Sequence, residues 1–73
     1  METSEIELIK QLVPTHAELR HLVQQHRSFE EELGRLERIR FPTEAERREI
    51  NKIKRLKLRG KDRIAGILKA HTS

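Results

Sequence analysis

The sequence contains no cysteine, no tryptophan and no tyrosine, and it has only two phenylalanines and two prolines. Without cysteine the chain can form neither a disulfide bond nor a thiolate metal site. It also lacks the aromatic side chains that most often stack on nucleic-acid bases or anchor a protein at a membrane surface. Only 34% of its 73 residues are hydrophobic, which leaves little apolar bulk for a compact globular core.

Signals for secretion and membrane insertion are also missing. No apolar run is long enough to span a bilayer. The first residues, METSEIELIKQL, have neither the basic start nor the apolar centre of a signal peptide. We therefore expect a cytoplasmic protein, and contact with a membrane is not expected.

The chain has no arrangement of residues that is typical of an enzyme. It shows no nucleophile paired with a base, no clustered pair of carboxylates and no glycine-rich phosphate loop. His16, His21 and His26 are spaced by five residues. Such a step turns each side chain about 140° from the last on a helix, whereas zinc ligands on one helix need steps of three or four. We expect no catalysis, no metal, no cofactor and no small-molecule substrate.

The composition that is present favours helices. Charged residues make up 38% of the chain, as is typical of coiled coils and long helices. Pro14 and Pro42 divide the sequence into three segments, which predict helices over about residues 4–13, 15–40 and 43–70. Each segment opens with a capping box, in which a hydroxyl and a glutamate satisfy free backbone N–H groups. The three pairs are Ser4 with Glu7, Thr15 with Glu18, and Thr43 with Glu46.

Apolar residues recur at helical intervals in both long segments, and the connection between them is short. A short connection makes neighbouring helices antiparallel. The expected fold is therefore all-α: one domain over residues 1–73, built as a long, coiled-coil-like antiparallel hairpin with a short N-terminal helix. Because the apolar stripes are wider than one partner helix can cover, we also predict a homodimer that forms a four-helix bundle. The stripes comprise Leu19, Leu22, Phe29, Leu33 and Leu36, then Ile50, Ile53, Ile64 and Ile67.

Three residues interrupt the apolar seam of this hairpin: His26, Lys57 and Gly60. A seam histidine can fix the register by hydrogen bonding, as buried polar residues do in coiled coils. Alternatively, protonation of His26 beside the charged Lys57 loosens the bundle, so that His26 acts as a pH switch. Gly60 either lets a neighbouring helix or a large side chain approach closely, or marks a weak point of its helix.

The net charge of +4 is distributed unevenly, because residues 1–32 carry −4 and residues 47–63 carry +7. In a hairpin that turns near Pro42, the numbers of facing residues sum to about 84. This register sets the acidic residues 30–32 beside the basic residues Lys52, Lys54 and Arg55. Such pairs set the orientation of helices more than they stabilise them.

A second set of basic residues is expected on the face away from the seam. Its members lie within about 80° of one another at 100° per residue. An outward basic stripe of this kind is either a solvated face or a surface that binds the phosphate backbone of nucleic acid without sequence preference. The stripe comprises Arg48, Lys52, Arg55, Arg59 and Arg63.

The segment IKRLKLRGKDRI at residues 53–64 resembles the YdcH-like family of small bacterial coiled-coil proteins. That family carries a segment similar to LKKEKLRLKDEI in its C-terminal helix, and its preceding helix has a similar apolar–His–apolar pattern. The resemblance covers about residues 6–69 and implies a helical hairpin in the bacterial cytoplasm, without an established activity. This chain departs from it at Leu56, Gly60 and Arg63. The matching residues are Lys54, Lys57, Leu58, Arg59, Lys61, Asp62 and Ile64.

These observations favour a non-enzymatic protein that acts through self-association and through contact with a protein partner. One alternative is nucleic-acid binding by the basic stripe, and a membrane-surface or general adaptor role is a third and weaker one. The absence of tyrosine and tryptophan weighs against base stacking, but it leaves phosphate contacts open.

Overall fold

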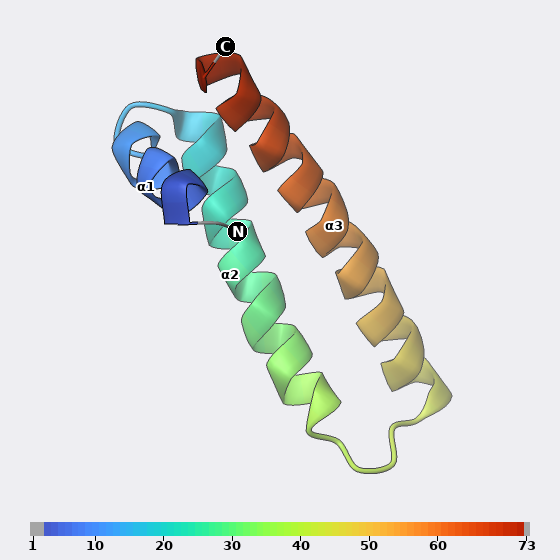
Figure 1. Ribbon diagram of the computed structural model, residues 1–73. Coiled ribbons are helices and arrows are strands. Elements are labelled where there is room, and N and C mark those ends of the chain that lie inside the picture. The colour runs from blue at the N-terminus through green and yellow to red at the C-terminus, as the bar shows by residue number, and fades with distance from the viewer. Residues whose placement is uncertain (1–2, 73) are drawn as a thin grey trace.

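The computed structural model describes residues 3–72 and contains three α-helices over that range. They are α1 (Thr3–Leu12), α2 (Ala17–Glu37) and α3 (Glu44–Thr72). Helices α2 and α3 lie side by side in opposite directions and form a hairpin (Figure 1). The predicted all-α hairpin with a short N-terminal helix is therefore confirmed. The molecule is elongated, with principal dimensions of 45 × 21 × 16 Å.

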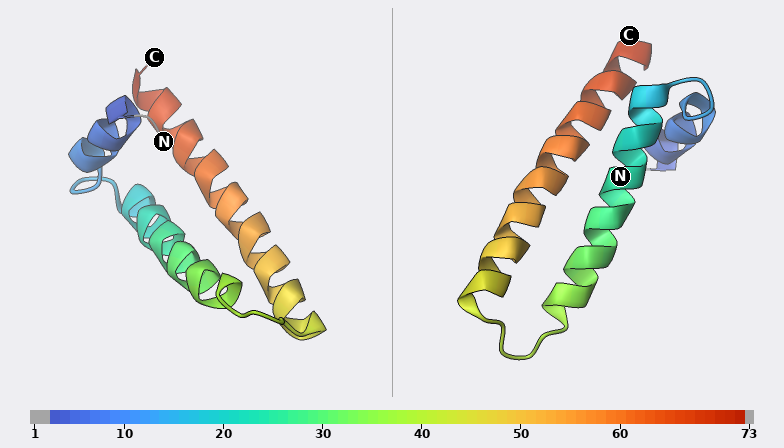
Figure 2. Two further views of the ribbon diagram at one scale, coloured as in Figure 1. Left: turned by 60° about the horizontal axis from the view of Figure 1, so that its bottom comes forward. Right: turned by 180° about the vertical axis from the view of Figure 1, so that it is seen from behind.

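Helix α1 packs against only one end of the hairpin, where α2 begins and α3 ends. Two further views keep it at that end and leave the other half of the hairpin as a pair of helices (Figure 2). The buried residues follow this division and form two apolar clusters, one beneath α1 and one near the turn. The first contains Ile9, Leu19, Ile64, Ile67 and Leu68, and the second contains Leu33, Leu36 and Ile53.

The three expected capping boxes have different outcomes. At the start of α3 the box is confirmed, because Glu46 N–H donates to Thr43 Oγ1 (3.1 Å) and Thr43 N–H donates to Glu46 Oε1 (2.8 Å). The box at Thr15 is wrong, because α2 is capped by His16, whose Nδ1 accepts from the N–H of Leu19 (3.1 Å). The Thr15 hydroxyl instead donates to the Leu12 carbonyl.

The box expected at Ser4 is also wrong, because α1 already begins at Thr3 and Ser4 lies inside it. The end of α2 differs from expectation as well. It ends at Glu37 rather than near Arg40, and Ile39 N–H closes the last turn on the Leu36 carbonyl. A proline disfavours helix at the residue before it, so the chain has to leave the helix before Phe41 and uses residues 38–43 to cross to α3.

The register of the hairpin is close to the predicted one. Glu30 pairs with Lys57 and Glu18 pairs with Arg63, so facing numbers sum to 87 and 81. The particular partners expected for the acidic run were wrong. Within residues 3–72, no ion pair joins residues 30–32 to residues 52–55, because Glu30 reaches Lys57 instead. The predicted sum of about 84 therefore gives the position of α3 along α2 to within about one helical turn.

Candidate interaction site

A polar layer separates the two apolar clusters. It consists of His26 and Glu30 on α2 and Lys57 on α3, two of which were predicted as seam positions. The Nε2 atom of His26 lies 2.8 Å from Glu30 Oε1, and the Nζ atom of Lys57 lies 3.6 Å from the same oxygen. Because both contacts use Oε1, the layer holds two nitrogen groups against one carboxylate, and among residues 3–72 neither ion pair uses Oε2 of Glu30.

The contact with Glu30 favours a proton on Nε2 of His26, because a carboxylate accepts hydrogen bonds and cannot donate them. The other ring nitrogen, Nδ1, is buried and has no hydrogen-bond partner among the described residues. An unpaired buried polar atom costs stability, so this layer links the two helices less tightly than an apolar layer would.

Gly60 is half-buried and lies one turn from Lys57 on the seam side of α3. A Cβ placed on it would meet nothing within 4 Å, and the same is true of Gly34 and Gly66. Within the described chain, no helix or side chain therefore approaches Gly60 closely enough to require a glycine. The expectation that Gly60 allows a close approach is therefore wrong inside the hairpin. The other expectation, that Gly60 is a weak point of α3, stays a prediction.

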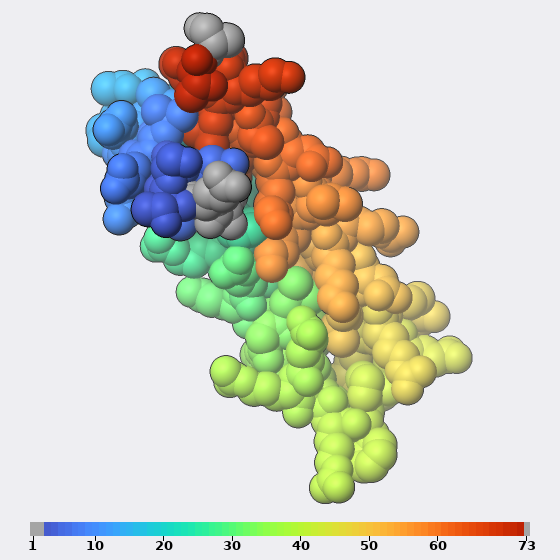
Figure 3. All heavy atoms as spheres, in the orientation of Figure 1, coloured from blue at the N-terminus to red at the C-terminus, as the bar shows by residue number. Residues whose placement is uncertain are grey.

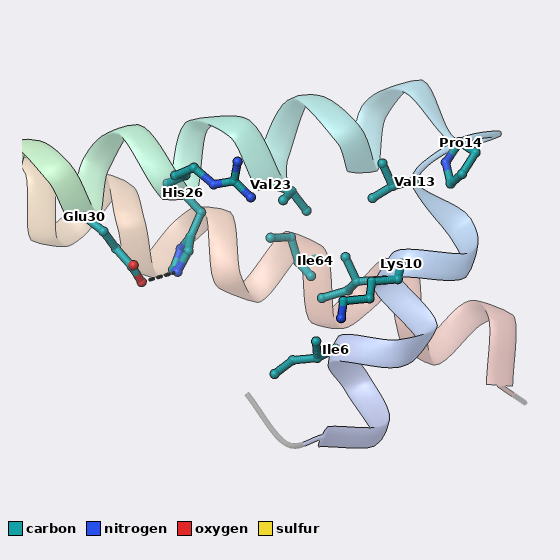
Figure 4. Close-up of a pocket in the computed structure, with 10 residues that line it drawn as sticks. Ile6, Lys10, Val13, Pro14, Val23, His26, Glu30 and Ile64 are labelled. Carbon is teal, nitrogen blue, oxygen red and sulfur yellow. Dashed lines mark ion pairs between the residues drawn. The ribbon is translucent and has the colours of Figure 1, made fainter.

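A cleft of about 560 Å³ opens beside the polar layer, between α1 and the hairpin. Figure 4 shows Ile6 of α1 and Val23 of α2 pointing into it, with Ile64 of α3 behind them and His26 and Glu30 at one end. Most of the lining is apolar, although Ile6 is 41% exposed. The cleft does not follow from the sequence pattern, because it depends on the angle at which α1 meets the hairpin.

Two cations, Lys10 of α1 and Arg27 of α2, stand on the wall of the cleft. Among residues 3–72, neither forms an ion pair with an acidic side chain, and Glu30 is the one carboxylate that lines the cleft. The cleft therefore combines an apolar floor with charges that the hairpin itself does not neutralise, a combination typical of binding surfaces.

The predicted basic stripe is divided by the structure. Arg48, Lys52 and Arg55 line a shallow concavity on α3 and have no ion pair within the described residues, and Arg59 is exposed as well. Side chains of α3 project from the side of the molecule remote from α1 (Figure 3). Glu49 lies among these basic residues and reduces their net charge.

Arg63 does not belong to a free stripe. Its Nε and Nη2 atoms donate to the two oxygens of Glu18, at 3.1 and 2.8 Å, and so connect α3 to the first turn of α2. These hydrogen bonds hold the pKa of Glu18 below its usual range and raise the pKa of Arg63. The expectation that Arg63 faces only solvent was wrong, because Glu18, freed from the expected capping box, reaches across to it.

Further findings concern metal ligands, membrane spans and the lining of the cleft. Over residues 3–72 there is no group of three metal-ligating side chains, and no helix is both long and apolar enough to cross a membrane. The described residues that line the cleft include no serine, threonine or cysteine that could act as a nucleophile. Comparison with protein-family models, with curated proteins and with solved structures gives no match.

Proposed function

We propose that this protein is a non-enzymatic helical-hairpin module that acts by binding to itself and, through the assembled surface, to a protein partner. The observation that carries this proposal is the open apolar cleft with its unneutralised cations, Lys10 and Arg27. Burial of such a surface is the main favourable term in protein association. A second copy that covers the cleft gives the four-helix arrangement expected from the wide apolar stripes.

The small size of the hairpin supports the same proposal. A chain of this length buries a smaller share of its surface than a larger domain does, so association adds stability that one copy lacks. Its resemblance to the YdcH-like family at residues 53–64 is consistent with a bacterial cytoplasmic hairpin and suggests no catalytic role.

Sedimentation equilibrium at tens of micromolar chain tests the self-association. We expect a mass of twice the 8.7 kDa chain, falling to the chain mass on dilution. Circular dichroism on the same samples checks that the helices are intact. A monomer mass at full helicity, at this concentration and at low salt, would overturn the proposal.

Nucleic-acid binding is the second candidate, and it is favoured by Arg48, Lys52 and Arg55, which have no ion pair with α2 among the described residues. Phosphate contacts release counterions, so affinity for duplex DNA or RNA should fall steeply as salt rises. The variant Arg48→Glu/Arg55→Glu/Arg59→Glu should lose most of that binding. The control is Arg38→Glu/Arg40→Glu/Lys69→Glu, which makes the same change of charge at three exposed residues outside the stripe. If both variants bind equally well, or if the wild type does not bind, the stripe is a solvated face.

A further inference from the structure

One face of α2 is self-complementary when two copies run antiparallel. Residues 20, 23, 27, 30, 34 and 37 follow alternating steps of three and four, so they form a single line along the helix, next to the line that packs on α3. Val23, Arg27 and Glu30 of this line are on the wall of the cleft. Figure 4 shows Val23 and Glu30 on the same side of α2. We infer that this line is the contact between two copies of the chain.

The charges along the line change sign at its middle. Arg20 and Arg27 occupy its first half, and Glu30 and Glu37 occupy its second half. In an antiparallel pair of helices, facing residues have a constant numerical sum. The sum that sets Arg27 opposite Glu30 of the second copy also sets Arg20 opposite Glu37. Two-fold symmetry repeats each contact, so four oppositely charged pairs form, and a parallel arrangement would set like charges together.

The same register matches the two residues of the line that carry no charge. Val23 lies opposite Gly34 of the second copy, so a branched side chain faces a residue that has no side chain. Gly34 is half-buried and has open space where its Cβ would lie. Such a pair lets the two helices approach closely, which gives Gly34 a role that no contact within the described chain explains.

None of the four charged residues of the line is fully neutralised inside the hairpin. Over residues 3–72, Arg20, Arg27 and Glu37 have no ion pair. Glu30 uses only Oε1 for His26 and Lys57, so its Oε2 can accept from Arg27 of the second copy. The partner's α2 then lies in the cleft beside α1, where it covers Ile6.

This interface specifies the surface used by the self-association proposed above and rests on it. It spans residues 20–37, or about 26 Å of helix at 1.5 Å per residue. Exposed ion pairs are individually weak and are screened by salt. The association is therefore expected to weaken as ionic strength rises, whereas an interface formed only by apolar side chains would strengthen or stay unchanged.

Charge reversal at the outer pair tests the register without disturbing the cleft. In a homodimer, Arg20→Glu sets the new glutamate opposite Glu37, and Glu37→Arg sets the new arginine opposite Arg20. Each reversal also moves a charge to the end of α2 that the helix dipole favours, so the hairpin itself should stay folded. We expect each variant alone to associate about tenfold more weakly than the wild type, because two attractive pairs become repulsive.

Mixing the two variants is the decisive measurement. In a heterodimer of Arg20→Glu with Glu37→Arg, the new glutamate at position 20 of one chain faces the new arginine at position 37 of the other. The second outer pair is the native Glu37 with Arg20. Both outer pairs therefore join opposite charges. Equimolar mixing should therefore restore dimers that neither variant forms well alone. Phe41→Ser, at the exposed hairpin tip, is the control and should associate as the wild type does. Sedimentation equilibrium gives the mass, and circular dichroism confirms the helices.

The outcomes separate the two proposals. If the wild type dimerises and the reversals neither weaken association alone nor restore it when mixed, the α2 interface is wrong and self-association stands on another surface. If the wild type is monomeric throughout, self-association and the α2 interface both fail.

Discussion

Replacement of Gly60 by alanine probes the seam of the hairpin directly. Glycine inside a helix costs about 1 kcal/mol relative to alanine. A Cβ at this position meets nothing within 4 Å, so no steric cost opposes the gain in helix stability. The new methyl group is half-buried in the seam, which adds up to about 0.4 kcal/mol at roughly 0.8 kcal/mol per buried CH2 group. Gly60→Ala should therefore raise the free energy of unfolding by about 1 to 1.4 kcal/mol.

Thermal unfolding followed by circular dichroism measures this change. For a domain of about 60 to 100 residues, about 1 kcal/mol corresponds to a rise in Tm of roughly 4 to 8 °C. Chain concentration has to be fixed, because association makes Tm depend on concentration. Gly66→Ala is the matched control, since Gly66 is exposed on the same helix and its Cβ is also free of contacts.

We expect Gly66→Ala to stabilise by about 1 kcal/mol, slightly less than Gly60→Ala. A destabilised Gly60→Ala beside a stabilised Gly66→Ala would refute the reasoning. It would mean that something packs against Gly60 that the isolated hairpin does not contain, such as a second copy. A loss of dimer mass in the Gly60 variant would identify that contact.

Three other predictions concern single side chains. Arg63 lowers the pKa of Glu18 in the folded state. The contribution of ionised Glu18 to the free energy of unfolding is therefore present above the unfolded pKa of about 4.3, and it is lost as the pH falls through the folded pKa. Urea unfolding should therefore show a larger loss of stability between pH 7 and pH 3 for the wild type than for Glu18→Gln, and equal losses would contradict this. His26→Leu removes the buried unpaired Nδ1 and should raise the free energy of unfolding by about 1 to 2 kcal/mol; a decrease would mean that the polar layer stabilises the fold. Thr43→Ala should cost about 1 kcal/mol through the lost capping box, whereas Thr15→Ala should cost almost nothing, and similar losses would refute the assigned caps.

The arrangement of α2 and α3 could be predicted because its determinants are local. The seven-residue pattern identifies the faces that pack together, and Pro42 fixes the position of the turn. The charge runs also suggested the register to within a helical turn. What decided the actual pairs was the geometry of single side chains. Glu18 could serve either as a cap or as a partner of Arg63, and the sequence alone does not rank those two contacts.

The cleft could not be predicted because it depends on the angle between α1 and the hairpin. The turn at residues 13–16 connects α1 to the hairpin, and there His16 rather than Thr15 caps α2. The α2 line was visible in the sequence, since Arg20, Arg27, Glu30 and Glu37 recur at helical steps. Their importance appears only once the cleft shows that this face of α2 lies open beside α1.

The central claim is that two copies of this hairpin associate through the open face of α2. A concentration series of 15N–1H correlation spectra on the uniformly labelled wild-type chain tests both the association and its location. We predict that amide signals of residues 20–37 and of Ile6 shift as the chain is diluted from hundreds of micromolar, while those near Phe41 stay in place. Spectra that do not change with concentration, or changes confined to residues 48–59, would contradict the claim.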